Sequence, residues 1–343
     1  MIWLGLLVAV CFVPGYTGAS IPTQWAVLSC LLPLSLWRPG SISTLHWLGL
    51  AFLVYACLSL SWTHDWHVGI WGLWVLGIAA CSFWLGSTLA SLDGLLKGLA
   101  LGLSVSAVVA AFQAFNYHPV ITFLSIGSPG LLYNPIAAGE ACALVIIGLV
   151  TYRLYWFIPG PTLALILSHS RGAWLACAVG LVAIWLRRPL YLAIGLAAFG
   201  VAFTLHLAPS DEQRLQIWSV AWALLSPFGL GPGMFFDIFY LTPHGAIYPE
   251  YAHNDFLQLL VEYGIGAVPL FALAGLALTQ RQAAGLPLFV AFLVMGLYSF
   301  PFYAPFTLFL GAAAAGGLAR DWSLSRTHSL LGRPYLLSCV VTP

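Results

Sequence analysis

The chain has 343 residues, 61% of them hydrophobic and only 6% charged, and its mean hydropathy is +0.96. Soluble domains carry about 25% charged residues, so this composition excludes a soluble globular protein and indicates an integral membrane protein. A net charge of +1 and seven scattered cysteines also disfavour a nucleic-acid-binding face, a disulfide framework and a cysteine metal site.

A membrane-spanning helix needs roughly 20 apolar residues, and proline, glycine and charge clusters mark where such stretches end. These criteria predict an all-α, polytopic bundle of about 12 transmembrane helices that forms one membrane domain over residues 1–343. The predicted spans are residues 1–18, 21–37, 42–62, 67–90, 98–116, 135–152, 157–169, 172–187, 189–207, 255–279, 283–300 and 303–319. The span at 157–169 is short and is interrupted by Pro159 and Pro161.

The basic residues predict which side of the membrane each loop faces, because Lys and Arg in short loops stay cytoplasmic. Nine of the eleven lie at the ends of every second span or in the C-terminal tail, at Arg38, Lys97, Arg153, Arg187, Arg188, Arg281, Arg320, Arg326 and Arg333. Both termini are therefore expected to be cytoplasmic. Arg171 and Arg214 fall on the opposite side, where an anionic ligand is a natural partner for them.

The outer connections are then residues 19–20, 63–66, 117–134, 170–171, 208–254 and 301–302, and only 117–134 and 208–254 are long. The large loop at 208–254 is expected to contain short helices. Its first helix begins at Ser210-Asp211-Glu212. Apolar residues spaced for one face then follow, so this helix is expected to lie in the outer membrane interface. These residues are Leu215, Trp218, Val220, Ala221, Trp222 and Leu225.

A glycine-rich stretch, Phe228-Gly229-Leu230-Gly231-Pro232-Gly233, ends this helix. It is either a simple turn or a backbone that lets a phosphate or sugar approach closely. The second alternative makes Gly231 and Gly233 candidate substrate-binding residues.

The large loop ends at His253, and Asn254 and Asp255 can cap the span that follows. A helix N-terminus favours anions. A single interfacial histidine is more often a packing residue, but His253 adjoins a cap and has an intramembrane acid, Glu262, two turns below it.

Three segments, in order and each at the predicted outer face, carry recognisable motifs: Ser168–Trp174, Arg214–Trp218 with Pro227–Gly233, and His253–Gly266. Tyr133-Asn134-Pro135 is a weaker match. Together they resemble the bacterial O-antigen ligase and O-antigen polymerase superfamily, over roughly residues 130–300. The first 120 residues match it only as generic spans.

The resemblance implies a glycosyltransferase of the bacterial inner membrane whose active site faces the periplasm. Such enzymes move a glycan from an undecaprenyl-pyrophosphate carrier to an acceptor hydroxyl without a metal or other cofactor. By analogy, Arg171 and Arg214 would hold the pyrophosphate and His253 would sit at the reaction centre. The acceptor is lipid A core sugar for ligases, the growing glycan for polymerases and a protein hydroxyl for O-oligosaccharyltransferases.

The chemistry of these residues agrees with that reading. The planar fork of arginine suits phosphate oxygens, and each charge pair is worth roughly 4 kcal/mol before desolvation. No acidic cluster in the sequence suits a hard cation. His253 is either the general base or a hydrogen-bond donor to pyrophosphate.

The remaining candidates for substrate binding are Asn134, Glu140, Asn254, Asp255 and Glu262. The three acids are further candidates for the base. Acids in spans usually face a cavity or a partner, so pairing of Glu140 or Glu262 with an arginine is as plausible as catalysis. A secondary transporter with a proton relay is the alternative from another class. It is disfavoured because the charges gather at one face and no repeat is present.

Overall fold

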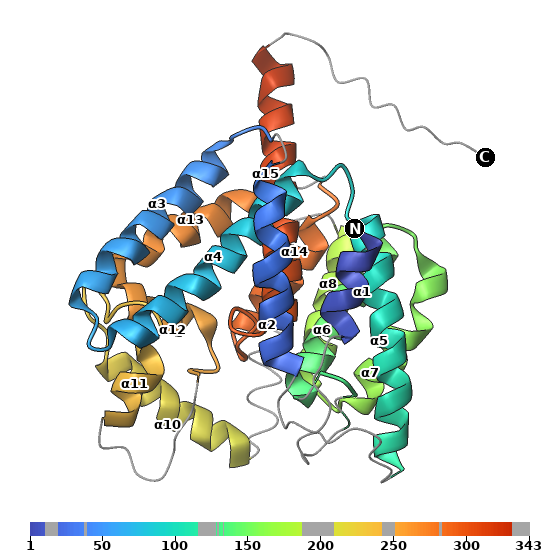
Figure 1. Ribbon diagram of the computed structural model, residues 1–343, viewed down its shortest axis with the longest axis horizontal. Coiled ribbons are helices and arrows are strands. Elements are labelled where there is room, and N and C mark those ends of the chain that lie inside the picture. Colours follow the sequence, from blue (N-terminus) through green and yellow to red (C-terminus); the bar gives the residue numbers. More distant parts are fainter. Residues whose placement is uncertain are drawn as a thin grey trace.

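The computed structural model describes residues 1–10, 20–37, 40–115, 128, 130–132, 134–186, 209–241, 251–280 and 283–330. Within these ranges every regular element is a helix (Figure 1). The α-helices are α1 (Ile2–Val10), α2 (Ser20–Leu31), α3 (Thr44–Ser59), α4 (Trp66–Thr88), α5 (Asp93–Ala114), α6 (Pro135–Thr151), α7 (Pro159–Leu167), α8 (Arg171–Leu186), α10 (Pro209–Ala223), α11 (Met234–Leu241), α12 (Asp255–Tyr263), α13 (Val268–Ala277), α14 (Leu286–Gly296) and α15 (Pro305–Leu330). Short 3₁₀ helices are η1 (Leu32–Trp37), η2 (Leu60–Trp62), η3 (Tyr155–Phe157) and η4 (Gly264–Ala267).

Four described segments are long and apolar enough to cross a membrane: Thr44–Trp62, Trp66–Thr88, Asp93–Ala114 and Asp255–Ala277. Four shorter apolar helices accompany them, at Pro135–Thr151, Tyr155–Leu167, Arg171–Ile184 and Leu286–Gly296. An all-helical membrane protein is therefore confirmed. The predicted span at 189–207 and most of the loop at 117–134 lie outside the described residues, and the number of twelve spans stays a prediction.

Proline and asparagine set where several helices begin. Pro135 and Pro159 each open a helix, where the missing N–H costs nothing and the fixed φ suits the first turn. Pro159 therefore begins α7, although the sequence suggested that it interrupts a span. At α6, the Oδ1 atom of Asn134 accepts the Ile136 N–H at 2.8 Å and caps the helix.

Small residues let pairs of helices approach closely, as is common between membrane helices. In the α4–α15 pair, a Cβ on Gly86 would collide with the backbone of Ala313, and one on Gly316 with the backbone of Phe83. The same holds in the α1–α5 pair, where Gly98 packs on the backbone of Ile2. Larger side chains at these glycines would force the helices apart.

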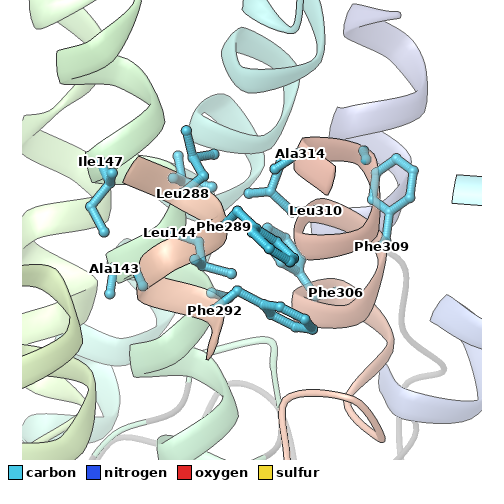
Figure 2. Packing of buried hydrophobic residues seen from close by; sticks show 14 of the residues in the cluster. Ala143, Leu144, Ile147, Leu288, Phe289, Phe292, Phe306, Phe309, Leu310 and Ala314 are labelled. Atoms are coloured by element: carbon cyan, nitrogen blue, oxygen red, sulfur yellow. The ribbon is translucent and has the colours of Figure 1, made fainter. Parts of the chain in front are cut away.

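The central core joins α6, α14 and α15 (Figure 2). In this view α14 lies between α6 and α15, and Phe289 and Phe292 of α14 point toward α15. The labelled members are Ala143, Leu144, Ile147, Leu288, Phe289, Phe292, Phe306, Phe309, Leu310 and Ala314. This core fixes the ends of α6, α14 and α15, from which part of the candidate site is built.

Loops that the charge pattern predicts on one side contact one another. At one end of the bundle, Arg320 donates to the Leu89 carbonyl and the Ser41 and Ser323 hydroxyls lie 2.8 Å apart. At the opposite end, which carries α10 and α11 (Figure 1), Trp62 Nε1 donates to the Gly229 carbonyl at 3.2 Å. Which end faces the periplasm stays a prediction.

Candidate active site

Helices α10, α11 and α12 form a small unit with its own apolar core, made by Ile217, Ala221, Phe235, Phe239, Ala252, Leu257 and Val261. The sequence predicted one apolar face on α10, but the structure shows two stripes. Ile217 and Ala221 are buried, whereas Leu215 and Trp222 are 44% and 63% exposed. The exposed stripe is suited to a membrane interface, and the location of this helix in the outer interface stays a prediction.

The glycine-rich turn is tied to the far end of α12. Leu230 N–H donates to the Val261 carbonyl at 2.9 Å, and Gly231 N–H donates to the Glu262 carbonyl at 2.8 Å. Gly264 ends α12 with φ at 51°, a left-handed conformation that favours glycine. The turn and the end of α12 therefore form one rigid corner.

Gly231 and Gly233 also have positive φ angles, 104° and 69°. A Cβ on Gly231 would collide with the side chain of Thr63, and one on Gly233 would lie 3.0 Å from the Val68 carbonyl oxygen. Protein atoms thus occupy the space beside both glycines. Close packing explains these glycines without a ligand, and the predicted contact with substrate stays untested.

Glu262 is buried and holds three segments together through its carboxylate. Its Oε2 atom accepts the Gly233 N–H at 3.1 Å and the Tyr303 hydroxyl at 3.0 Å. Its Oε1 atom accepts Gln258 Nε2 at 3.0 Å, and Gln258 in turn accepts the Ala252 N–H at 2.9 Å. These contacts give Glu262 a positioning role next to His253.

His253 stands between Ala252 and the cap of α12, and its φ of 52° is unusual for a residue with a side chain. Asn254 Oδ1 accepts the Leu257 N–H at 3.0 Å and caps the helix, as predicted. The His253 ring packs edge-on against Phe300, and its buried Nδ1 has no hydrogen-bond partner among the described residues. Burial, and then the nearby Arg214 charge, lower the pKa of His253 to about 4, so the imidazole is neutral at pH 7.

Arg214 lies in the second turn of α10 and is half-buried. Its charge acts on His253, on Glu140 of α6 and on Tyr298 after α14. These residues are far apart in the sequence, and the fold brings all three within electrostatic reach of one guanidinium group. Arg214 and His253, both predicted as catalytic, are thus neighbours.

Arg171 is exposed at the first residue of α8. Ser170 Oγ accepts the Ala173 N–H at 3.4 Å and so starts the helix. The Gly172 carbonyl accepts the Tyr298 hydroxyl, and the Tyr298 ring fills the place that a Cβ of Gly172 would take. Through Tyr298, the Arg171 end of α8 is joined to the surroundings of Arg214.

Three buried polar side chains near Arg214 have unsatisfied atoms. Glu140 lies beside Ser299, but neither its carboxylate oxygens nor Ser299 Oγ have a well-aligned partner among the described residues. Asp255 Oδ2 accepts the Phe302 N–H at 2.9 Å, whereas its Oδ1 has no partner in the same set. Buried polar atoms are normally paired, so this cluster is suited to hold water or a polar ligand.

Two neighbouring cavities lie beside this cluster and share one lining residue. The smaller, about 260 Å³, is lined by Asn134 and His253 among others, and the larger, about 600 Å³, is almost wholly apolar and lies among α3, α4, α13, α14 and α15. Tyr303 lines both. No group of three or more His, Cys, Asp or Glu side chains in the described part of the chain is arranged to hold a metal ion.

Residues 154–272 match a family model described as O-antigen ligase. This match, over about a third of the chain, supports the resemblance to the O-antigen ligase superfamily that the motifs indicated. The match includes Arg171, Arg214, His253 and Glu262, and it leaves out Asn134, Glu140 and the residues after α14. No curated protein matches the chain.

Several residues of the site were not predicted from the sequence. The predicted connection at 301–302 is only two residues long, yet the segment around it provides Tyr298, Ser299 and Tyr303. Gln258 could have been found, because it lies four residues before Glu262 and therefore on the same helix face. Nothing in the sequence pattern indicated Gln24, which lines the smaller cavity.

Proposed function

We propose that the chain is a glycosyltransferase of the bacterial inner membrane that moves a glycan from an undecaprenyl-pyrophosphate carrier to an acceptor hydroxyl. The reaction takes place on the periplasmic face, with inversion at the anomeric carbon, as in O-antigen ligases. The family match supports a membrane glycosyltransferase of this type. The observation that carries the proposal is that Arg214 lies near neutral His253, which lines a cavity with several polar groups, and that Tyr303 separates this cavity from an apolar one.

The apolar cavity suits the lipid part of such a donor. Its lining runs from Tyr303, beside the polar site, to His46 near the start of α3. A long unbranched or isoprenoid chain is the ligand that such a cavity accepts, because burying apolar surface is its main source of binding energy.

The pyrophosphate of the donor would bind beside Arg214 and Arg171. Arg214 is held on a packed helix, and its guanidinium can present two N–H groups to phosphate oxygens. Charge grows on the pyrophosphate as the glycosidic bond breaks, and fixed donors that meet developing charge lower the barrier. Arg171, at the exposed start of α8, would bind the other phosphate.

Each bond that forms in the transfer is matched by a bond that breaks. The acceptor oxygen attacks the anomeric carbon, the bond from that carbon to the phosphate oxygen breaks, and its electron pair leaves with the pyrophosphate. The acceptor proton passes to a base. His253 is neutral and can take it, and a bound pyrophosphate would raise its pKa from about 4 by replacing the repulsion from Arg214 with attraction.

The identity of the acceptor distinguishes three reactions of the same superfamily: ligation to lipid A core, polymerisation of the glycan and transfer to protein.

The alternative function, a secondary transporter, is disfavoured for a second reason. Glu262, which a proton relay would use, has its carboxylate occupied by Gly233, Gln258 and Tyr303.

The experiment measures transfer from a synthetic undecaprenyl-pyrophosphate glycan to lipid A core, free glycan or protein acceptors by purified protein. Arg214→Ala and Arg214→Lys should each lower turnover at least about 100-fold, because lysine keeps the charge but loses the paired geometry. Gln216→Ala, exposed on the same helix, is the matched control and should transfer normally. Activity should persist in excess EDTA. Near-normal transfer by well-folded Arg214→Ala would contradict the mechanism.

A further inference from the structure

The smaller cavity, of about 260 Å³, is built by segments from both halves of the chain. Gln24 of α2 and Asn134 at the start of α6 form part of its wall. Tyr251 and His253 contribute from the segment before α12, and Phe300 and Thr307 contribute from the segment around the start of α15. Gln24 lies outside the matched family segment.

Two polar atoms in this wall have no partner within the described residues. Gln24 is 3% exposed and its Nε2 donor is unsatisfied, and so is His253 Nδ1. Other polar side chains of the wall already form hydrogen bonds within the protein. Asn134 caps α6, and Thr307 Oγ1 donates to the Pro301 carbonyl at 2.8 Å. Leaving a buried donor unsatisfied is costly, so the unpaired Gln24 amide is best explained by a ligand that the cavity receives.

Aromatic rings form another part of the wall. Tyr251 stacks on Phe300 with ring centroids 4.8 Å apart and an interplanar angle of 20°, and it lies 5.2 Å from the Tyr303 ring. A sugar ring has an apolar face of C–H groups that packs on such rings, and hydroxyl groups at its edge for polar partners. Small-molecule sites combine apolar walls with a few polar groups in this way.

The charge and the size of the cavity further restrict the kinds of ligand that it can bind. Among the residues that the structure describes, its wall contains no Lys, Arg, Asp or Glu, so these residues offer no counter-charge to a pyrophosphate. A volume of about 260 Å³ leaves room for one sugar ring. The cavity is partly open, so further sugars of a glycan would extend outside it.

We infer that this cavity binds a single neutral pyranose ring and that the Gln24 amide donates a hydrogen bond to one of its hydroxyls. The inference rests on the proposed function, because it makes the ring part of the glycan being transferred. The ring comes either from the donor, as the sugar next to the pyrophosphate, or from the acceptor.

Stability measurements separate a ligand-binding glutamine from a structural one. Gln24→Met and Gln24→Leu remove an unpaired donor, so the melting temperature of the purified protein should stay the same or rise. Gln113→Leu is the matched control. Gln113 is buried, with Nε2 donating to the Gly130 carbonyl at 3.1 Å and Oε1 accepting the Gly130 N–H at 2.9 Å. That variant should melt at a lower temperature.

Binding is measured by saturation-transfer NMR with methyl glycosides of common hexoses and N-acetylhexosamines. Gln24→Met should weaken binding of the preferred glycoside about tenfold, and Gln113→Leu should not. A glycoside that lacks the contacted hydroxyl should bind wild type and Gln24→Met equally. Absence of glycoside binding, or equal binding by wild type and Gln24→Met, would overturn the inference.

Kinetics identify the source of the ring. Gln24→Met should raise the KM for the donor if the ring belongs to the donor, and the KM for the acceptor otherwise. The Arg214→Ala variant distinguishes the proposed glycan transfer from the inferred sugar site, because Arg214 is not among the residues that line the cavity. It should abolish transfer but leave glycoside binding intact. Glycoside binding that depends on Gln24, without any transfer by wild type, would remove the proposed function and leave the sugar site standing.

Discussion

His253 combines a left-handed backbone with a buried, neutral ring. The backbone conformation costs about 1–2 kcal/mol in a residue with a side chain. It is held by the bonds on either side, from Ala252 N–H to Gln258 and from Leu257 N–H to Asn254. The ring is therefore positioned by main-chain contacts, and Nδ1 remains available to a ligand.

The lowered pKa of His253 predicts a pH-dependent stability. The unfolded chain binds a proton at the ordinary pKa of 6.5, whereas the folded chain does so only at about 4. The unfolded state therefore binds more protons between these values, and stability falls as the pH is lowered through this window. At pH 5, wild type should lose about 2 kcal/mol relative to His253→Gln, compared with pH 7. Melting curves of both proteins at the two pH values test this, and identical pH profiles would contradict it.

Among the helices, the corner between α12 and the glycine-rich turn sets the position of the site. The turn bonds to α12 at Val261 and Glu262, and Ile265 N–H donates to the Pro227 carbonyl at 2.9 Å. Because α10 leads directly into this turn, the corner also fixes the helix that carries Arg214. A distortion here would move Arg214 relative to His253.

Gly264→Ala tests the corner. Gly264 has a φ of 51°, and a Cβ there would lie 2.6 Å from Gly229 N. The substitution should destabilise the protein by more than about 1 kcal/mol and lower glycan transfer. Gly275→Ala is the control, because nothing lies within 4 Å of its Cβ position and alanine favours the helix. Equal melting temperatures and activities of the two variants would show that the corner is not rigid.

In the whole molecule, the two ends of the bundle differ in character. The start of α1 and the last turns of α15 lie at one end, and α10 and α11 lie at the other (Figure 1). The cluster around Arg214 and His253 is built beside α10, together with the first turns of α6 and α12. A donor that enters from the membrane would place its lipid among the helices and its head group at this end.

Reporter fusions test the orientation. Because basic loops stay cytoplasmic, fusions after residues 64, 128 and 240 should report a periplasmic location. Fusions after residues 91, 188 and 325 should report a cytoplasmic one. The site after residue 91 is chosen because α5 begins at Asp93. A cytoplasmic reporter at residue 240 would overturn the placement of the active site on the periplasmic face.

The sequence by itself determined the class of the protein, the helix cap beside the site and the candidate site residues. Hydropathy defines most of the helices, because length and apolar content decide whether a segment can cross a bilayer. Asn254 could be predicted as a helix cap, since capping depends only on neighbouring residues. Arg171, Arg214 and His253 were found from motifs and from the side of the membrane on which they fall.

Only the tertiary structure decided which of these residues meet. Arg214 acts on Glu140 and Tyr298, and Tyr303 reaches Glu262, although each pair is far apart along the chain. It also placed Gln24 in the wall of the cavity and filled the space beside Gly231 with Thr63. Periodicity and spacing describe one segment at a time, whereas these contacts depend on how the packed helices are arranged around one another.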